Sequence, residues 1–225
     1  MTFSLILRDP ETGEFGSAIS SSSPAVAARC VNLADGVGGA HSQNVTDPRL
    51  GPALIEQLRT GRSAQDAVDA VVAAADPATI DFRQLLVLDA QGAPAVFSGG
   101  KALGVFGAAS RENAVAGGNM LASLDVLDAL VETALTAPGR IEERLLAALR
   151  AAVEAGGEAG PVHSAGIAVV GNAGWRVTDL RVDWADDPVE QLGRALDEWL
   201  PQRDDYVSRG LNPTAAPSYG VPGDE

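Results

Sequence analysis

The order of strand-like and helix-like segments is the feature of this sequence that most narrows its fold. β-rich runs come in pairs around short turns, first at residues 3–9 and 14–20 around PETG and later around ADG, DAQG and NAG. Segments with a helical spacing of apolar residues also come in pairs, and one more follows the last strand pair. These helical segments span residues 47–61, 63–76, 121–135, 140–157 and 187–200.

Such an order favours stacked sheets over a strictly alternating parallel fold. Consecutive hairpins form mainly antiparallel sheets, and helices that arrive in pairs need a sheet face to cover. We therefore expect an α+β fold, a four-layer αββα sandwich of two mainly antiparallel sheets flanked by helices. Asp47 and Ser63 are the expected N-caps of the first helix pair, and residues 25–45 are expected to form two short strands around ADG.

The chain is expected to form one domain over residues 1–200. Its 225 residues suffice for one large core, and nothing in these first 200 has the composition of a linker. Residues 201–225 are rich in Pro, Gly, Asp and Ser and lack an apolar period. We expect this C-terminal extension to be loop or disordered.

Charge and composition argue against several classes of function. The chain carries 30 acidic and 16 basic residues, a formal net charge of −14 that repels nucleic acid. No apolar run approaches the roughly 18 residues that span a bilayer, so we expect a cytoplasmic protein without a membrane partner. One cysteine and two histidines leave little from which to build a metal or cofactor site, and neither is expected. A homodimer through the helices is compatible with the sequence.

Thr2 is the candidate nucleophile. Amide hydrolysis needs a nucleophile, a base that takes its proton, and hydrogen-bond donors for the oxyanion. An N-terminal threonine supplies the first two, because an α-amine ordinarily has a pKa of about 7.7–8.0 and can accept the hydroxyl proton. Removal of Met1 would expose this amine, and such removal is favoured when a small residue follows. The alternative is that Thr2 only begins a strand.

The opening TFSLILRDPETGEFGSAIS resembles that of the N-terminal nucleophile (Ntn) hydrolases of the proteasome type. Together with GVGGAHSQNVTDPRLGP, RQLLVLDAQG, GGNMLA and DLRVDWADDPVEQL, it is similar to a bacterial family catalogued as domain of unknown function 1028 and placed by fold among the Ntn hydrolases. The similarity covers about residues 2–198. It implies an Ntn-type amidohydrolase that cleaves an amide or ureido C–N bond of a small molecule through Thr2.

The resemblance also implies partners for Thr2. In proteasome-like enzymes a Gly-Ser-Gly segment places a hydroxyl beside the threonine amine, and Asn119 would occupy that neighbourhood here. Asn119 and backbone N–H groups near Gln43 would hold the oxyanion, and Gly118 is a substrate-binding candidate. Those enzymes also keep a lysine and an aspartate beside the threonine, whereas this chain has SSSSPAVAARC after the second strand. The Thr2 amine would therefore act with neutral partners, among which Ser21 is a candidate.

Further polar residues at strand ends are candidates for the same site. Gln43 is a candidate oxyanion or substrate contact, with helix entry as the alternative, and His41 and Ser42 precede it on the same strand. Arg83 begins a strand and either binds a substrate carboxylate or forms a surface ion pair. Ser164, at the start of the penultimate strand, completes the substrate-binding candidates.

Alternatives of other classes are compatible with the same residues. A non-catalytic protein could use the same cleft for a ligand, and a peptidase or acyltransferase could use the same nucleophile. A pair formed by Cys30 and His41 is a rival nucleophile and base, although a buried core cysteine is the commoner case.

Overall fold

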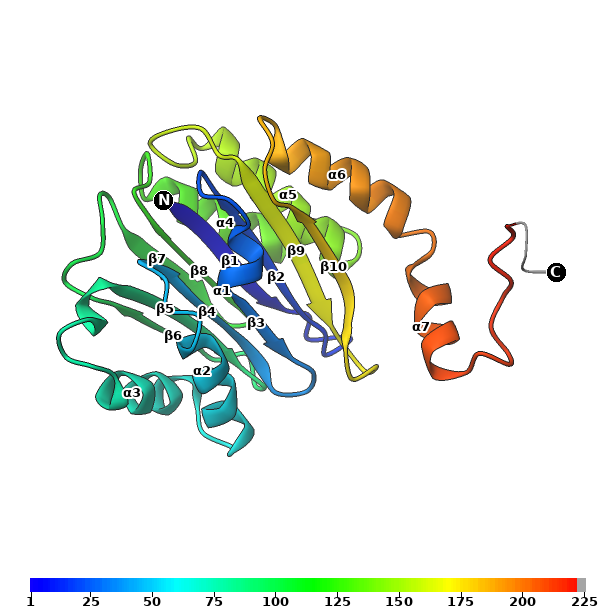
Figure 1. The fold of residues 1–225 in the computed structure, drawn as a ribbon, viewed down its shortest axis with the longest axis horizontal. Coiled ribbons are helices and arrows are strands. Elements are labelled where there is room, and N and C mark those ends of the chain that lie inside the picture. Colours follow the sequence, from blue (N-terminus) through cyan, green and yellow to red (C-terminus); the bar gives the residue numbers. More distant parts are fainter. Residues whose placement is uncertain (222–225) are drawn as a thin grey trace.

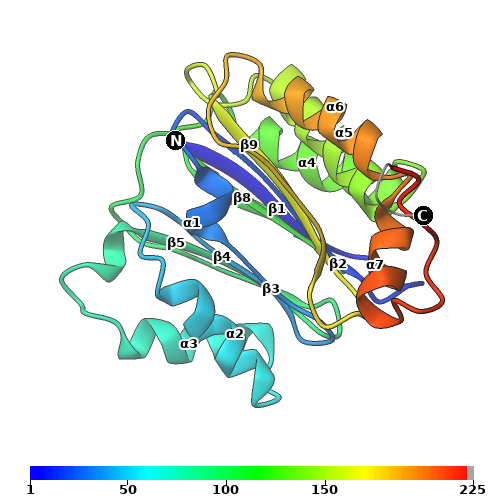
Figure 2. The same ribbon diagram turned by 45° about the vertical axis from the view of Figure 1, so that its right-hand side comes forward.

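Two β-sheets stack face to face between layers of helices in the computed structural model, which describes residues 1–221 (Figure 1). Figure 2 shows the four layers from the side, with one group of helices outside each sheet. The predicted α+β fold, a four-layer αββα sandwich of two mainly antiparallel sheets flanked by helices, is confirmed. Every strand pairing within the two sheets is antiparallel.

The larger sheet carries the N-terminal hairpin at its centre. Its six strands lie in the order β10 (Arg176–Val182), β9 (Ser164–Val170), β2 (Phe15–Ser21), β1 (Thr2–Arg8), β8 (Ala114–Asn119) and β7 (Gly107–Arg111). Its outer face is covered by α4 (Asp125–Thr136), α5 (Ile141–Glu154) and α6 (Pro188–Trp199). Phe3, Leu5 and Leu7 alternate along β1 toward these helices and belong to their core.

The smaller sheet is packed on the other side. Its four strands lie in the order β3 (Val31–Ala34), β4 (Gly38–Asn44), β5 (Arg83–Asp89) and β6 (Pro94–Ser98). Its outer face is covered by α2 (Leu50–Arg59) and α3 (Ala64–Ala74). Leu85 and Val87 face these helices, whereas Leu86 and Leu88 face the larger sheet.

The space between the sheets is apolar at one end and polar at the other. The apolar end contains Ile6, Phe15, Leu86, Leu88, Val115 and Val170. Gly39 brings the sheets together there, because an added Cβ would lie 2.6 Å from Cγ2 of Ile6. At the polar end, hydroxyl, imidazole and carboxamide groups line the same layer. This division places polar side chains around the start of β1.

Three elements depart from the sequence-based expectation. Val26–Cys30 form a short helix, α1, where a strand was predicted, and it begins after Ala25 in the left-handed conformation. β7 is an additional edge strand. The prediction that the C-terminal extension is loop is wrong for Arg203–Leu211, which form α7, while residues 222–225 of that extension lie outside the described residues.

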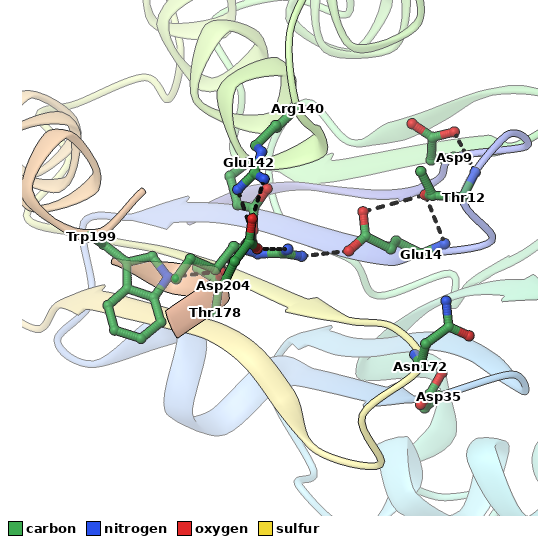
Figure 3. Close-up of polar contacts among 11 residues, drawn as sticks. Asp9, Thr12, Glu14, Asp35, Arg140, Glu142, Asn172, Thr178, Trp199 and Asp204 are labelled. Atoms are coloured by element: carbon green, nitrogen blue, oxygen red, sulfur yellow. Dashed lines mark hydrogen bonds and ion pairs between the residues drawn. The ribbon is translucent and has the colours of Figure 1, made fainter. Parts of the chain in front are cut away.

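A buried ion-pair cluster explains the position of α7. Arg203 forms ion pairs with Glu14 and with Glu142, and the Glu142 side chain is only 1% exposed. Thr178 donates a 2.7 Å hydrogen bond to Glu142 and accepts one of 2.9 Å from the Trp199 indole (Figure 3). α7 is thus fastened to the end of the larger sheet away from Thr2, at the β1–β2 turn.

The helix starts are set by different groups. Ser63 caps α3 as predicted, since its hydroxyl accepts a hydrogen bond from the backbone N–H of Asp66. Asp47 is not the N-cap of α2; it lies before Arg49, the N-cap residue, and forms an ion pair with it. No helix among residues 1–221 is long and apolar enough to cross a membrane.

Candidate functional site

The ends of three neighbouring strands of the larger sheet, β2, β1 and β8, lie side by side next to the first residues of the chain. Thr2 at the beginning of β1 lies directly opposite Asn119 at the end of β8. Ser21 at the end of β2 lies on the other side, with its hydroxyl 3.4 Å from that of Thr2. Thr2 is 5% exposed, and Ser21 and Asn119 are fully buried. The predicted grouping of these three residues is therefore present in the structure.

The carbonyl oxygen of Met1 lies between two of these hydroxyls. It accepts hydrogen bonds from both Thr2 and Ser21. The Ser21 hydroxyl also accepts a hydrogen bond from the backbone N–H of Ser23 at 3.0 Å, so its proton and one of its two lone pairs are engaged. While Met1 is present, the nitrogen of Thr2 is an amide nitrogen and cannot serve as a base.

Gln84 orients a buried network beneath Thr2. Its Nε2 donates to the backbone carbonyls of Gly107 and Gly118, at 3.2 and 3.1 Å, and to the Ser98 hydroxyl. Because a carbonyl oxygen only accepts, these bonds decide which end of the carboxamide is nitrogen. Gln84 Oε1 consequently faces the site and accepts a hydrogen bond of 2.8 Å from Nε2 of Gln43.

The orientation of the Gln84 carboxamide also determines which nitrogen of His41 carries the proton. Gln43 Oε1 accepts the hydroxyl of Ser4 at 2.6 Å, so Ser4 has no proton left for the imidazole. Nδ1 of His41, 2.9 Å from the same hydroxyl, must donate to it. Nε2 is then the acceptor and receives the Ser17 hydroxyl at 2.7 Å. His41 is therefore a neutral imidazole in a single tautomer.

The protonation of His41 agrees with this geometry. Its side chain is fully buried, and burial, with a smaller contribution from the charge of Arg176, lowers the pKa of His41 to about 3. A histidine with so low a pKa and two hydroxyl partners is fixed in place. It supports the strands that carry Ser4 and Ser17, because each of its ring nitrogens is hydrogen-bonded to one of these serines.

Asn119 presents an acceptor with no partner. Its Nδ2 donates to Gln84 Oε1 at 3.4 Å, whereas its buried Oδ1 has no hydrogen bond among the described residues. A buried carboxamide oxygen without a donor is costly, at about 1–3 kcal/mol, and is usually satisfied by a ligand, water or a changed state of the chain. This orientation leaves Asn119 with a free acceptor on the residue that pairs with Thr2 across the sheet.

Glu158 is a functional candidate that the sequence analysis missed. It lies in the loop between α5 and β9, is 4% exposed, and accepts the backbone N–H of Ser22 with both oxygens, at 3.1 and 3.2 Å. Burial raises the pKa of Glu158 to about 7, and the Met1 ammonium opposes this shift. The signal available in the sequence was a lone carboxylate after the Gly-Gly pair that ends a helix.

The remaining candidates lie around the site or away from it. Ser164 donates to the Ser23 carbonyl at 2.6 Å and so holds the loop that follows Ser21. Gly118 allows a close approach, because an added Cβ would lie 3.0 Å from the Thr2 carbonyl oxygen. Ser42 donates to the Asp47 carbonyl on the outer face of the smaller sheet and does not face Thr2.

Arg83 and Cys30 are not part of the cluster around Thr2. Arg83 lies on the opposite face of β5 from Gln84, donates to the Val45 carbonyl, and lines a surface cavity of about 480 Å³ next to α2 and α3. Cys30 is buried against Thr46, and burial raises the pKa of its thiol. The rival pair of Cys30 and His41 is not hydrogen-bonded, because the thiol bonds to Thr46 and both imidazole nitrogens bond to serines.

Comparison with known proteins identifies related sequences and folds. A family model described as a family of unknown function, DUF1028, matches residues 2–192. The crystal structure of a DUF1028 protein from Silicibacter pomeroyi is 29% identical, with a TM-score of 0.84 over 92% of this chain and 94% of that chain. The ancestral β-subunit Anbu from Yersinia bercovieri is 10% identical, with a TM-score of 0.40 over 89% and 95% of the two chains. Curated proteins give no significant match.

Proposed function

The chain belongs to DUF1028, a family of unknown function, and from the site of this member we propose an Ntn-type amidohydrolase that cleaves a C–N bond of a small molecule. Thr2 is the nucleophile, and removal of Met1 exposes its α-amine. The observation that carries the proposal is the free Oδ1 of Asn119 directly across from Thr2. A new ammonium or amine at Thr2 is a donor that this oxygen lacks.

The first half of the proposed reaction forms an acyl-enzyme. The Thr2 hydroxyl oxygen attacks the carbonyl carbon while the Thr2 amine accepts the hydroxyl proton. Ser21 donates its hydroxyl to the developing oxyanion, as it does to the Met1 carbonyl oxygen. The amine then passes the proton to the leaving nitrogen, the C–N bond breaks, and the acyl group remains as an ester on Thr2.

Water completes the cycle. The free Thr2 amine takes a proton from water as the water oxygen attacks the ester carbonyl, and the proton returns to the Thr2 oxygen as the C–O bond breaks. Asn119 Oδ1 accepts a hydrogen bond from one N–H of the Thr2 amine, so that the lone pair of the amine nitrogen faces the Thr2 hydroxyl. Gln43 and His41 act beneath the site as parts of the hydrogen-bonded layer that fixes Ser4 and Gln84.

The chain offers a test that needs no known substrate. Untagged protein is measured by intact mass, and turnover is screened with an amide and ureide library for the wild type and Thr2→Ala. Loss of one methionine residue and activity that disappears in Thr2→Ala support the proposal. Complete retention of Met1 in the native host leaves Thr2 without a base and favours the alternative, a non-catalytic ligand-binding protein.

An amidohydrolase, a peptidase and an acyltransferase with this nucleophile differ in the leaving group they prefer and in the molecule that accepts the acyl group. A peptidase would prefer peptides to small amides, and an acyltransferase would pass the acyl group to an added amine faster than to water. Product analysis in the same screen, with and without a primary amine, distinguishes the three reactions.

A further inference from the structure

Met1 occupies the space next to Thr2 that an acyl group would enter. We propose that the site accepts α-aminoacyl amides and that Glu158 recognises the α-ammonium group of the acyl unit. This inference rests on the proposed function, because it takes Met1 as a stand-in for the acyl part of a substrate. It adds a substrate class and a residue that selects it.

The carbonyl group of Met1 supplies the first correspondence. Met1 is an aminoacyl unit bonded to the nitrogen of Thr2, whereas a substrate acyl unit would be bonded to the hydroxyl oxygen of the same residue. Both Thr2 and Ser21 donate hydrogen bonds to the Met1 carbonyl oxygen, so the carbonyl already lies against the nucleophile and the proposed oxyanion donor. The carbonyl group of an acyl unit on the Thr2 oxygen would lie close to the position that the Met1 carbonyl group now occupies.

The ammonium group of Met1 supplies the second correspondence. Glu158 is 4% exposed and accepts the N–H of Ser22, the neighbour of Ser21, whose hydroxyl donates to the Met1 carbonyl oxygen. Burial raises the pKa of this carboxyl group, and the Met1 ammonium has the smaller, opposite effect. Among residues 1–221 no lysine or arginine forms an ion pair with Glu158, although a buried carboxylate is normally paired. The two Ser22 contacts fix its direction but supply no full positive charge. A ligand ammonium next to the acyl carbonyl would provide the missing countercharge.

The side chain of Met1 supplies the third correspondence between Met1 and a substrate acyl unit. Its terminal methyl carbon lies 4.0 Å from the position that a Cβ on Gly160 would take, so the end of the side chain lies next to the loop that carries Glu158. The backbone N–H of Ala159 donates to the Met120 carbonyl at 3.0 Å and ties this loop to the end of β8. The loop thus lies along the aminoacyl unit and is fixed to the strand that carries Asn119.

A pair of substrates that differ only in the amino group tests this inference. Methionine anilide and 4-(methylthio)butanoic acid anilide share the leaving group and the side chain, but only the first has the ammonium. We expect wild-type kcat/KM to be higher for methionine anilide by roughly tenfold or more, the range for a hydrogen bond to a charged group. This ratio requires no variant and therefore does not depend on whether a variant folds.

Glu158→Gln identifies the residue responsible. Glutamine can still accept the Ser22 N–H, so the loop keeps its anchor while the negative charge is lost. The preference for the methionine substrate, measured as the ratio of the two kcat/KM values, should fall toward one. Glu154→Gln is the matched control, since it removes the same charge from an exposed position on α5 and should leave the ratio unchanged.

Failure of this inference and failure of the proposed function give different results. Equal hydrolysis of the two anilides by the wild type, or a ratio that Glu158→Gln does not change, overturns the aminoacyl specificity and leaves Thr2 as the nucleophile. Absence of any acyl adduct on Thr2 with reactive esters of both acids, in a chain that begins at Thr2, overturns both.

Discussion

Thr2 and Asn119 pair directly across β1 and β8, and the buried carboxamide oxygen of Asn119 has no hydrogen-bond partner among the described residues. The direction of this carboxamide follows from Gln84, whose nitrogen is held by two backbone carbonyls and whose oxygen therefore takes the Asn119 nitrogen. A chain that begins at Thr2 would place an amine opposite this oxygen. Loss of Met1 should therefore change what Asn119 contributes to the protein.

Asn119→Ala should affect two forms of the chain differently. In a chain that retains Met1 it removes an unsatisfied oxygen, whereas in a chain that begins at Thr2 it removes the acceptor of the new amine. The loss of unfolding free energy should be larger in the second form by about 1–2 kcal/mol. Denaturant unfolding of both forms, released from a cleavable N-terminal fusion partner, measures the difference. Equal losses would mean that Asn119 does not bind the amine.

Ser21→Ala should slow acylation of Thr2 without unfolding the protein. The Ser21 hydroxyl is the proposed oxyanion donor, and removal of one such donor typically costs about 10²–10³ in rate. The rate of adduct formation with an active ester, followed by intact mass, measures the effect. Ser22→Ala is the matched control, because Ser22 contributes its backbone N–H to Glu158. Similar rates for the two variants would remove Ser21 from the mechanism.

His41 should make stability depend on pH below neutrality. Burial lowers its pKa from 6.5 to about 3, so between these values the unfolded chain binds more protons than the folded chain. The free energy of unfolding should therefore be unaffected by His41 above pH 6.5 and should fall as the pH drops, by up to about 1.4 kcal/mol per unit. His41→Gln lacks this contribution. Parallel plots of unfolding free energy against pH for the wild type and the variant would contradict the prediction.

The tautomer of His41 gives an independent check on the same network. The hydrogen-bond directions require the proton on Nδ1 and a neutral imidazole. Nitrogen chemical shifts of the ring should show a protonated Nδ1 and an unprotonated Nε2 at neutral pH. The opposite tautomer would mean that Ser4 donates to the ring and that the carboxamides of Gln43 and Gln84 are reversed.

Arg203→Ala should destabilise the fold strongly although it lies far along the chain from the site. It leaves Glu142 as a buried carboxylate without its countercharge, and breaking a buried pair in this way costs about 3–5 kcal/mol. Arg194→Ala removes an exposed pair with Asp187 and should cost under about 1 kcal/mol. Thermal unfolding of the two variants compares the costs, and equal small losses would show that α7 is dispensable.

The sequence pattern predicted the elements that carry regular apolar spacing. The N-terminal hairpin, the β5–β6 and β9–β10 hairpins and the helices α2 to α6 were all recognisable, because each buries one periodic face. α1 has only five residues, too few to show a helical period, and the small residues of β7 lack the apolar alternation of a buried strand. α7 is mainly polar and depends on the distant partners of Arg203.

The site could be predicted only in part for the same physical reason. Thr2, Ser21 and Asn119 lie at strand ends that adjacent strands bring together, and the resemblance to the proteasome-type enzymes indicated which of these residues to group. Glu158 lies in an irregular loop, where no periodicity relates a residue to its neighbours in space. The hydrogen-bond directions in the layer beneath Thr2 depend on which carbonyls contact Gln84, and this requires the packing of both sheets.

Covalent capture of the N-terminus tests the central claim most directly. An α′,β′-epoxyketone forms a ring only with a residue that offers both a free α-amine and a neighbouring hydroxyl, which here means Thr2 after loss of Met1. Peptide mass spectrometry of the treated protein should show one adduct on the N-terminal peptide beginning at Thr2, and none in Thr2→Ala. A folded chain that begins at Thr2 and remains unmodified, or an adduct at another residue, would contradict the assignment of Thr2 as the nucleophile.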